Sequence, residues 1–314
     1  MALQPNQFSL PSIQKALVMN EKEQLVVWDE APCPVLPPDQ ALVRIEAVSL
    51  NPSNTKMKAD FANPFAIMGS DFAGTVVAVG PDAVGIALGD RVCGAQNEMF
   101  KATPEQGTFA QYTVTRSKMW MRVPETWTIE AAASIPVGLC TAGLAIRSLG
   151  LPLPNKPVAK AKHVLVYGSS TASATIAMQL LKLLEPDSDC ISNVESTTVC
   201  FKAIGRAGGN YVALEPFPRH AANRAVVTAD FVVGPCIFGD GCTYPAPYAR
   251  EPDEKIRAFG VELWEIAKKL VHEGKLNHHP IRILDGGFDA IQKGLDLLAK
   301  NGVSGEKIVV RMET

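Results

Sequence analysis

The chain has 314 residues, of which 47% are hydrophobic and 20% are charged, and its net charge is −2 at pH 7. These proportions are typical of a soluble globular protein, and the weak charge excludes binding to nucleic acid or anionic membranes through overall electrostatics. The length suits two ordinary domains. Residues 1–12 do not have the basic-then-apolar pattern of a signal peptide, so we expect a cytoplasmic protein.

The first third of the chain predicts short strands separated by turns. Residues 41–48, 74–80 and 109–114 have strand propensity, and Gly89-Asp90 predicts a tight turn into a further strand at 91–92. Several short strands at this spacing predict a compact, barrel-like domain.

Residues 128–149 predict helices instead, with Thr128 as the cap and Glu130 in the first turn. The uncharged run at 131–146 is short for a membrane span and contains Pro136, so a buried helix is the better interpretation. The three prolines within 151–157 predict a boundary, because proline blocks regular strand pairing.

After this boundary the pattern indicates a nucleotide-binding fold. Residues 163–168 predict a buried parallel strand, residues 169–174 a turn of small residues, and residues 175–184 a helix. A helix at 196–204, a turn at 205–209 and a strand at 211–214 are expected next, followed by helices at 257–273 and 288–300. The apolar last strand, 306–311, should pair with the sheet of the first domain.

The cysteine and histidine pattern argues against a metal site. None of the seven cysteines forms a CxxC pair, and His278-His279 has no cysteine nearby at ligand spacing. We therefore expect free thiols and no zinc.

Motifs spread over nearly the whole chain resemble the medium-chain dehydrogenase/reductase superfamily. They are Asn51-Pro52-Ser53-Asn54-Thr55-Lys56, Gly69-Ser70-Asp71-Phe72-Ala73-Gly74, Gly89-Asp90-Arg91-Val92, Thr141-Ala142-Gly143 and Ser304-Gly305-Glu306-Lys307. Residues 94–98, 193–198 and 245–248 more narrowly resemble the fungal trans-acting enoyl reductases that serve iterative polyketide synthases. In zinc-dependent members a cysteine and a histidine hold the metal, and here Asn51 and the Ser70-Asp71 region take those places.

This resemblance implies an α/β fold with a GroES-like β-barrel-type domain and a shortened Rossmann-like parallel-sheet domain. We expect the first domain at 1–150, a truncated nucleotide-binding domain at 151–248, and a segment at 249–314 that returns to the first domain. The implied function is transfer of a hydride from NADPH to an α,β-unsaturated thioester on a partner polyketide synthase, by a monomer. A free-standing NADPH quinone or enone reductase and an inactive truncated pseudo-enzyme are the alternatives.

The resemblance also implies the site residues. Catalytic roles fall on Lys56 and Thr141, because without zinc the charge on the thioester oxygen needs hydrogen-bond donors. Cofactor contacts are expected at Ser53, Asn54, Thr55, Lys56, Ser170, Thr171, Ala172, Ser173, Leu214, Glu215, Val303 and Ser304. The acyl pocket is expected at Thr141, Ala142, Gly143, Leu144, Ala145, Ile146, Arg147, Ser148, Gly234, Pro235, Cys236, Ile237 and Phe238.

Each of these assignments has a simpler structural alternative. Lys56 could be a solvated loop lysine, residues 168–173 an ordinary strand–helix turn, and the two pocket stretches ordinary core. At Glu215 the resembled enzymes have an amide, and an acid would disfavour a cofactor with several negative charges unless it faces away. Tyr112, Tyr167 and Tyr248 are possible proton donors, but core tyrosines are the simpler interpretation, and none is assigned.

One expected part of the nucleotide domain is missing from the sequence. Between Leu184 and Cys190 there is no second apolar strand, and about fifty residues, or two strand–helix units, are absent relative to the family. The strand at 163–168 would lose its neighbours on one side, and the 2′-phosphate of NADPH would have no partner. We therefore hypothesise weak or absent NADPH binding.

Overall fold

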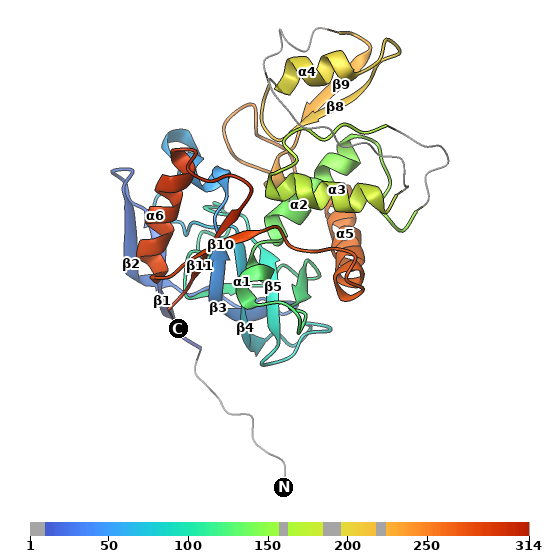
Figure 1. Ribbon diagram of the computed structural model, residues 1–314. Coiled ribbons are helices and arrows are strands. Elements are labelled where there is room, and N and C mark those ends of the chain that lie inside the picture. The colour runs from blue at the N-terminus through green and yellow to red at the C-terminus, as the bar shows by residue number, and fades with distance from the viewer. Residues whose placement is uncertain (1–9, 157–162, 185–195, 218–223, 314) are drawn as a thin grey trace.

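The computed structural model describes residues 10–156, 163–184, 196–217 and 224–313. Its centre is a seven-stranded sheet with strand order β10-β11-β3-β4-β5-β7, on which β6 pairs with β3 (Figure 1). Only β10 and β11 are parallel. The strands are β3 (Ala41–Ser49), β4 (Asp71–Val79), β5 (Arg91–Ala95), β6 (Tyr112–Val114), β7 (Trp120–Arg122), β10 (Ile281–Leu284) and β11 (Lys307–Arg311).

A separate hairpin closes one side of this sheet. It consists of β1 (Ile13–Met19) and β2 (Leu25–Pro32), and single bridges join Ala16 to Ala110 and Val18 to Ile67. Two short 3-10 helices, η1 (Pro52–Lys56) and η2 (Ala59–Phe61), follow β3. The predicted barrel-like domain of short strands is therefore confirmed, although β1, β2, β7 and β10 were not predicted.

The end of the chain returns to the first domain, as predicted. Strand β11 pairs antiparallel with β3, with Val310 opposite Val48. Helix α6 (Gly287–Ala299) lies beside this junction, and a Cβ at Gly294 would come within 2.3 Å of Leu50 Cδ1. The glycine therefore allows α6 to pack closely against the end of β3.

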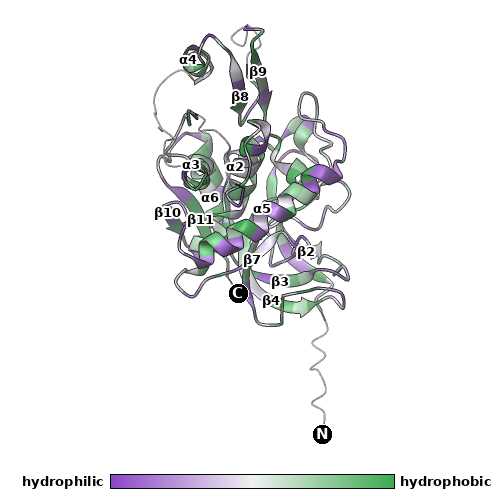
Figure 2. Ribbon diagram, turned by 90° about the vertical axis from the view of Figure 1, so that its right-hand side faces the viewer, coloured by the Kyte–Doolittle hydropathy of each residue, from purple (hydrophilic) through white to green (hydrophobic). Residues whose placement is uncertain are grey.

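Helix α1 (Ile129–Ala133) packs on β3, β4 and β5, helix α2 (Pro136–Ser148) packs on β4 and β5, and helix α5 (Glu254–His272) packs on β7. Helix α3 (Ala172–Lys182) packs on α2. The segment Ile129–Ser148 is long and apolar enough to span a membrane by composition, but 78% of its most apolar 18-residue stretch is buried inside the protein. Ala132, Leu139 and Ile146 are part of one core cluster with Trp264 of α5. The predicted buried helix is therefore confirmed. Figure 2 shows that α5, in contrast, has both hydrophilic and hydrophobic residues.

The remaining elements form a small parallel unit, drawn at the top of Figure 1. Helix α4 (Ser196–Ala203) precedes β8 (Gly209–Ala213), which pairs in parallel with β9 (Val227–Phe231). The 3-10 helix η3 (Gly234–Phe238) leads back toward α2 and α5. This is the parallel-sheet portion of a shortened Rossmann-like domain, and the predicted helix at 196–204 is confirmed.

The predicted strand at 163–168 is wrong. Residues 163–166 have no regular secondary structure, and β8 and β9 pair only with each other among the described residues. Val164 and Val166 pack half-buried against the large core cluster, so their apolar character is still used. A strand exists only through hydrogen bonds to neighbouring strands, and the sequence lacks the units that would supply them.

Helix α3 begins at Ala172 with Thr171 as its cap, three residues before the predicted start. The predicted gap between Leu184 and Cys190 and the beginning of the 193–198 motif lie outside the described residues. So do residues 1–9, which include most of the segment tested for a signal peptide.

Candidate functional site

A fully buried polar cluster lies where β3, β4 and β11 meet. Asp71 is 0% exposed, and its Oδ2 atom accepts hydrogen bonds from Ser49 Oγ, Asn51 Nδ2 and Lys307 Nζ, each at 2.8 Å. Its Oδ1 atom accepts the Val137 amide at the first turn of α2. The ammonium of Lys307 therefore compensates the carboxylate charge, which is costly to bury alone.

This cluster includes two of the places that the resemblance links to the lost metal. Lys307 Nζ also donates to Asn51 Oδ1 at 2.9 Å, so the Asn51 amide is fixed from both of its ends. Within the described ranges, no group of three or more His, Cys, Asp or Glu side chains is arranged to hold a metal ion. Asn51 and Asp71 instead hold the beginning of η1 on the sheet.

A second buried acid, Glu98, positions the η1 loop. Its Oε2 atom accepts hydrogen bonds from Asn54 Nδ2 at 2.7 Å and from the Gly69 amide at 3.2 Å. The other end of the Asn54 side chain accepts the Asn51 amide at 2.6 Å. Burial raises the pKa of Glu98 to about 7, although hydrogen bonds from Asn54, Gly69 and Ser70 lower it.

Lys56, at the end of η1, is not a free loop lysine. Its ammonium forms an ion pair with the Oε1 atom of Glu215, which follows β8. The other carboxylate oxygen, Oε2, accepts the Tyr248 hydroxyl at 2.9 Å. Two predicted cofactor-binding stretches, 53–56 and 214–215, are therefore brought together, and Glu215 faces the lysine.

Aromatic rings surround this contact. Tyr248 packs edge-to-face against Phe61 at 5.3 Å and against Phe231 of β9 at 5.7 Å between ring centroids. Burial, followed by the hydrogen bond and the charge of Glu215, raises the pKa of Tyr248 to about 12. Sequence analysis did not assign this tyrosine, because its hydrogen-bond partner Glu215 lies 33 residues earlier in the chain.

The predicted pyrophosphate turn has the local geometry of a helix start. Gly168 has a φ of 76°, which favours glycine, and Thr171 Oγ1 accepts the Ala174 amide at 3.4 Å to cap α3. Ser170 and Thr171 are exposed, while Ala172 and Ser173 are half-buried. The eleven-residue helix therefore begins beside small side chains that are exposed or half-buried, the setting in which a helix N-terminus can bind a phosphate.

The two stretches predicted to line the acyl pocket lie next to each other but are mostly core. Ala142, Gly143, Leu144 and Ile146 of α2 are buried, whereas Thr141 and Ala145 are half-buried. A Cβ at Gly143 would come within 2.2 Å of Leu263 Cδ2, so this glycine serves close packing of α2 on α5. Arg147 and Ser148 are exposed.

In the second stretch, Cys236, Ile237 and Phe238 are buried, and Gly234 and Pro235 are half-buried. The Arg116 guanidinium lies 4.9 Å from the centre of the Phe238 ring. These positions agree with the ordinary-core alternative for most residues of both stretches, and their role in substrate binding stays a prediction.

The other predicted contacts are spread out. Leu214 is 46% exposed, Val303 is half-buried against the core of the first domain, and Ser304 is exposed. Sequence analysis missed the contacts of Glu98 and the Asp71–Lys307 pair. A charged residue at the start of an apolar strand, such as Asp71 of β4 or Lys307 of β11, is a usable signal for such pairs, because buried charges need partners.

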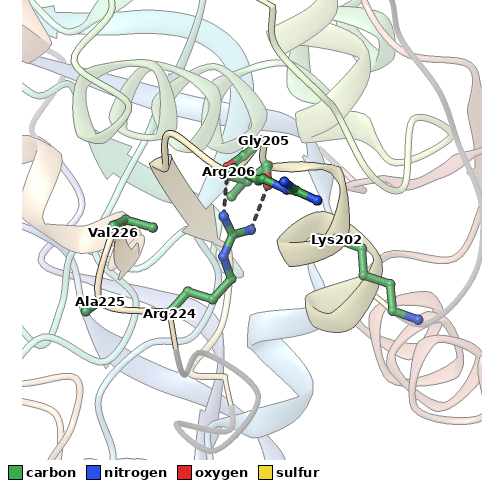
Figure 3. Close-up of a pocket in the computed structure, with 7 residues that line it drawn as sticks. Lys202, Gly205, Arg206, Arg224, Ala225 and Val226 are labelled. Carbon is green, nitrogen blue, oxygen red and sulfur yellow. Dashed lines mark hydrogen bonds between the residues drawn. The ribbon is translucent and has the colours of Figure 1, made fainter.

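A cavity of about 500 Å³ lies in the small parallel unit, lined by Lys202, Ile204, Gly205, Arg206, Arg224, Ala225 and Val226 (Figure 3). Two of its basic side chains, Arg224 and Lys202, point in different directions. The Arg224 guanidinium donates to the carbonyls of Phe201, Ile204 and Gly205 and so caps the C-terminal end of α4, whereas Lys202 points away from it.

Comparison with known proteins gives the family. The profile described as "Alcohol dehydrogenase GroES-like domain" matches residues 37–125. The chain is 51% identical to dehydrogenase mokE of Monascus pilosus over 97% of this chain and 99% of that protein. It is 49% identical to the enoyl reductase component lovC of the lovastatin nonaketide synthase of Aspergillus terreus, over 98% of each chain.

The trans-enoyl reductase FSL5 of Gibberella zeae is 38% identical over 96% of this chain and 98% of that protein. The chain belongs to the trans-enoyl reductases. As a member of this family within the medium-chain dehydrogenase/reductase superfamily, it is an oxidoreductase by descent. A solved enoyl reductase, CurK, has the same fold, with a TM-score of 0.69 at 13% identity and coverage of 96% of this chain and 99% of that one.

The family comparison also bears on the missing segment. The alignment with mokE extends over 355 positions, and this chain has 314 residues, so at least 41 positions have no residue of this chain. The predicted shortening relative to the family is thus confirmed. Its position between Leu184 and Cys190 stays a prediction.

Proposed function

We propose that this chain is a trans-acting enoyl reductase that transfers a hydride from NADPH to an α,β-unsaturated thioester carried by an iterative polyketide synthase. The observation that carries the proposal is identity of about one half, over nearly the full length, to mokE and to the enoyl reductase component lovC. The proposal extends to a cytoplasmic monomer with domains at 1–150, 151–248 and 249–314.

The chain's own residues fit one half of the cofactor. The turn at 168–173, in which Ser170 and Thr171 are exposed, suits the pyrophosphate, and Ser53, Asn54 and Thr55 lie on the η1 loop that Glu98 holds in place. When bound, NADPH supplies the hydride. Lys56 and Thr141 are the proposed donors for the charge that develops on the thioester oxygen.

The adenosine half of the cofactor has no matching part among the described residues. Residues 163–166 are in no sheet, and the family alignment leaves at least 41 positions without a residue. This observation favours a second candidate function, a pseudo-enzyme that docks on a synthase without transferring a hydride. A free-standing quinone or enone reductase needs the same cofactor and so meets the same difficulty.

The test is reduction of a synthetic enoyl-pantetheine thioester by the purified chain, followed through NADPH consumption and product mass. The proposal predicts turnover that falls at least tenfold in Lys56→Met. Lys58→Met is the matched control, because Lys58 is an exposed lysine two residues further along. No turnover by the chain, with retained binding to a synthase, would support the pseudo-enzyme instead.

A chimaera separates these outcomes. It carries the mokE residues of the gapped positions, inserted after Leu184. If the chimaera binds NADPH at least tenfold more tightly than the natural chain, the missing segment limits cofactor binding. Equal micromolar affinity in both proteins would refute that explanation.

A further inference from the structure

We propose that Glu215 lowers the affinity of this chain for its cofactor by holding Lys56 in a clasp, defined as the contact among Lys56, Glu215 and Tyr248. The inference rests on the proposed function, because it concerns the residues that this function assigns to NADPH. It assigns to Glu215 and Tyr248 an effect that neither the fold nor the family relationship requires.

The geometry of the carboxylate carries the argument. One oxygen of Glu215 is used by the Lys56 ammonium and the other by the Tyr248 hydroxyl, so both sides of the acid are occupied. The three side chains come from η1, the end of β8 and the loop before α5. A single carboxylate thus joins the GroES-like domain to two segments of the nucleotide-binding part.

The aromatic contacts hold the tyrosine in this position. Phe61 of η2 and Phe231 of β9 both pack edge-to-face on the Tyr248 ring. The Arg250 guanidinium lies over the Phe231 ring, 4.9 Å from its centre. Because the ring is held by both parts of the chain, its hydroxyl stays available to Glu215 without an added cost of ordering.

The clasp opposes an anionic ligand in two ways. A phosphate-bearing cofactor that uses Lys56 must first break the lysine–carboxylate pair. The freed carboxylate then stands near the incoming negative charge and repels it. The side chains of Lys56 and Glu215 are 46% and 50% exposed, so solvent screens the pair and the effect is modest.

The first experiment measures, without cofactor, how strongly the clasp slows the reaction of Lys56 with a reagent. The full chain is treated with limiting acetic anhydride, and acetylation of Lys56 is followed by mass spectrometry. Only the neutral amine attacks the anhydride, so an ion-paired ammonium reacts slowly because it must first leave the carboxylate and lose its proton. Glu215→Gln should raise the rate about two- to fivefold, the range of exposed ion pairs. Tyr248→Phe keeps the ring and should give a smaller increase.

The matched control is Glu251→Gln, which removes the same charge from an exposed position on the loop that carries Tyr248. It should leave the Lys56 rate unchanged. An unchanged rate in Glu215→Gln, or an equal increase in the control, would overturn the clasp.

The second experiment is titration of the same proteins with NADPH, followed by calorimetry. Glu215→Gln should bind about two- to fivefold more tightly than the natural chain, and Glu251→Gln should not. Equal or weaker binding by Glu215→Gln overturns the inference. If no variant binds NADPH, the proposed function fails for this chain, and the acetylation rates alone decide whether the clasp withholds Lys56.

Discussion

Replacement of Glu98 by glutamine tests the electrostatics of the loop that carries the proposed cofactor contacts. Glu98 is 4% exposed and receives its hydrogen bonds from Asn54 and Gly69, so an amide can keep the same acceptor without the charge. Burial raises the pKa of this carboxyl from 4.5 to about 7. The folded protein therefore binds a proton here more tightly than the unfolded chain does.

The sign and the size of the effect follow from this difference. The stabilisation from the bound proton is complete below pH 4.5 and is lost as the pH rises through about 7. The shift corresponds to a free energy on the order of 3 kcal/mol, of which about 2–3 kcal/mol falls between pH 5 and pH 8. Glu98→Gln lacks this titration, so its stability relative to the natural chain should rise by that amount over this range.

The measurement is guanidinium denaturation of both proteins at pH 5 and pH 8, compared as a difference so that all other titrating groups cancel. Glu21→Gln is the control, because Glu21 is exposed on the β1–β2 turn and its replacement should leave the pH dependence unchanged. The reasoning is refuted if Glu98→Gln and the natural chain lose stability equally between pH 5 and pH 8.

Three further changes test the packing around the site. Lys307→Ala should lower the free energy of unfolding by on the order of 3–5 kcal/mol, because it leaves Asp71 charged and buried. The double variant Lys307→Met with Asp71→Asn removes both charges and should recover most of this loss in the same denaturation assay. Gly74→Ala should lower the free energy of unfolding by about 2 kcal/mol or more, since its Cβ would come within 2.0 Å of the Arg44 carbonyl oxygen on the neighbouring strand. Gly205→Ala is the control, because a Cβ there meets nothing within 4 Å and should change the denaturation midpoint little. Arg224→Ala should speed amide hydrogen exchange in α4 and leave the seven-stranded sheet protected, because it uncaps only that helix.

The elements that sequence analysis predicted well are those with a strong local pattern. Helix α5 has a 3.6-residue apolar period and a capping Asp253, and it was located to within three residues at its start. Strand β11 was expected to pair with the first domain because an apolar strand needs a sheet, and it does so with β3. Short strands such as β7 and β10 were missed, because three or four residues carry no period of their own.

The strand predicted at 163–168 shows the limit of local pattern. Val164 and Val166 alternate in an apolar segment that suits a parallel sheet, and they do reach the core. Strand geometry, however, depends on partners elsewhere in the chain, and no described strand pairs with this segment. The missing strand–helix units predicted only that this strand would lose its neighbours on one side, and the strand itself was still predicted.

By itself the sequence predicted the family through its motifs, and the GroES-like profile and the relatives confirm that prediction. It also predicted a shortened nucleotide domain, and the alignment with mokE confirms that positions of this relative have no residue in the chain. It also singled out Lys56 and Glu215. Only the tertiary structure decided that the two side chains are paired, with Tyr248 on the other carboxylate oxygen. The physical reason is that 159 residues separate the lysine from the acid, and no local rule relates charges at that distance until the fold brings them together.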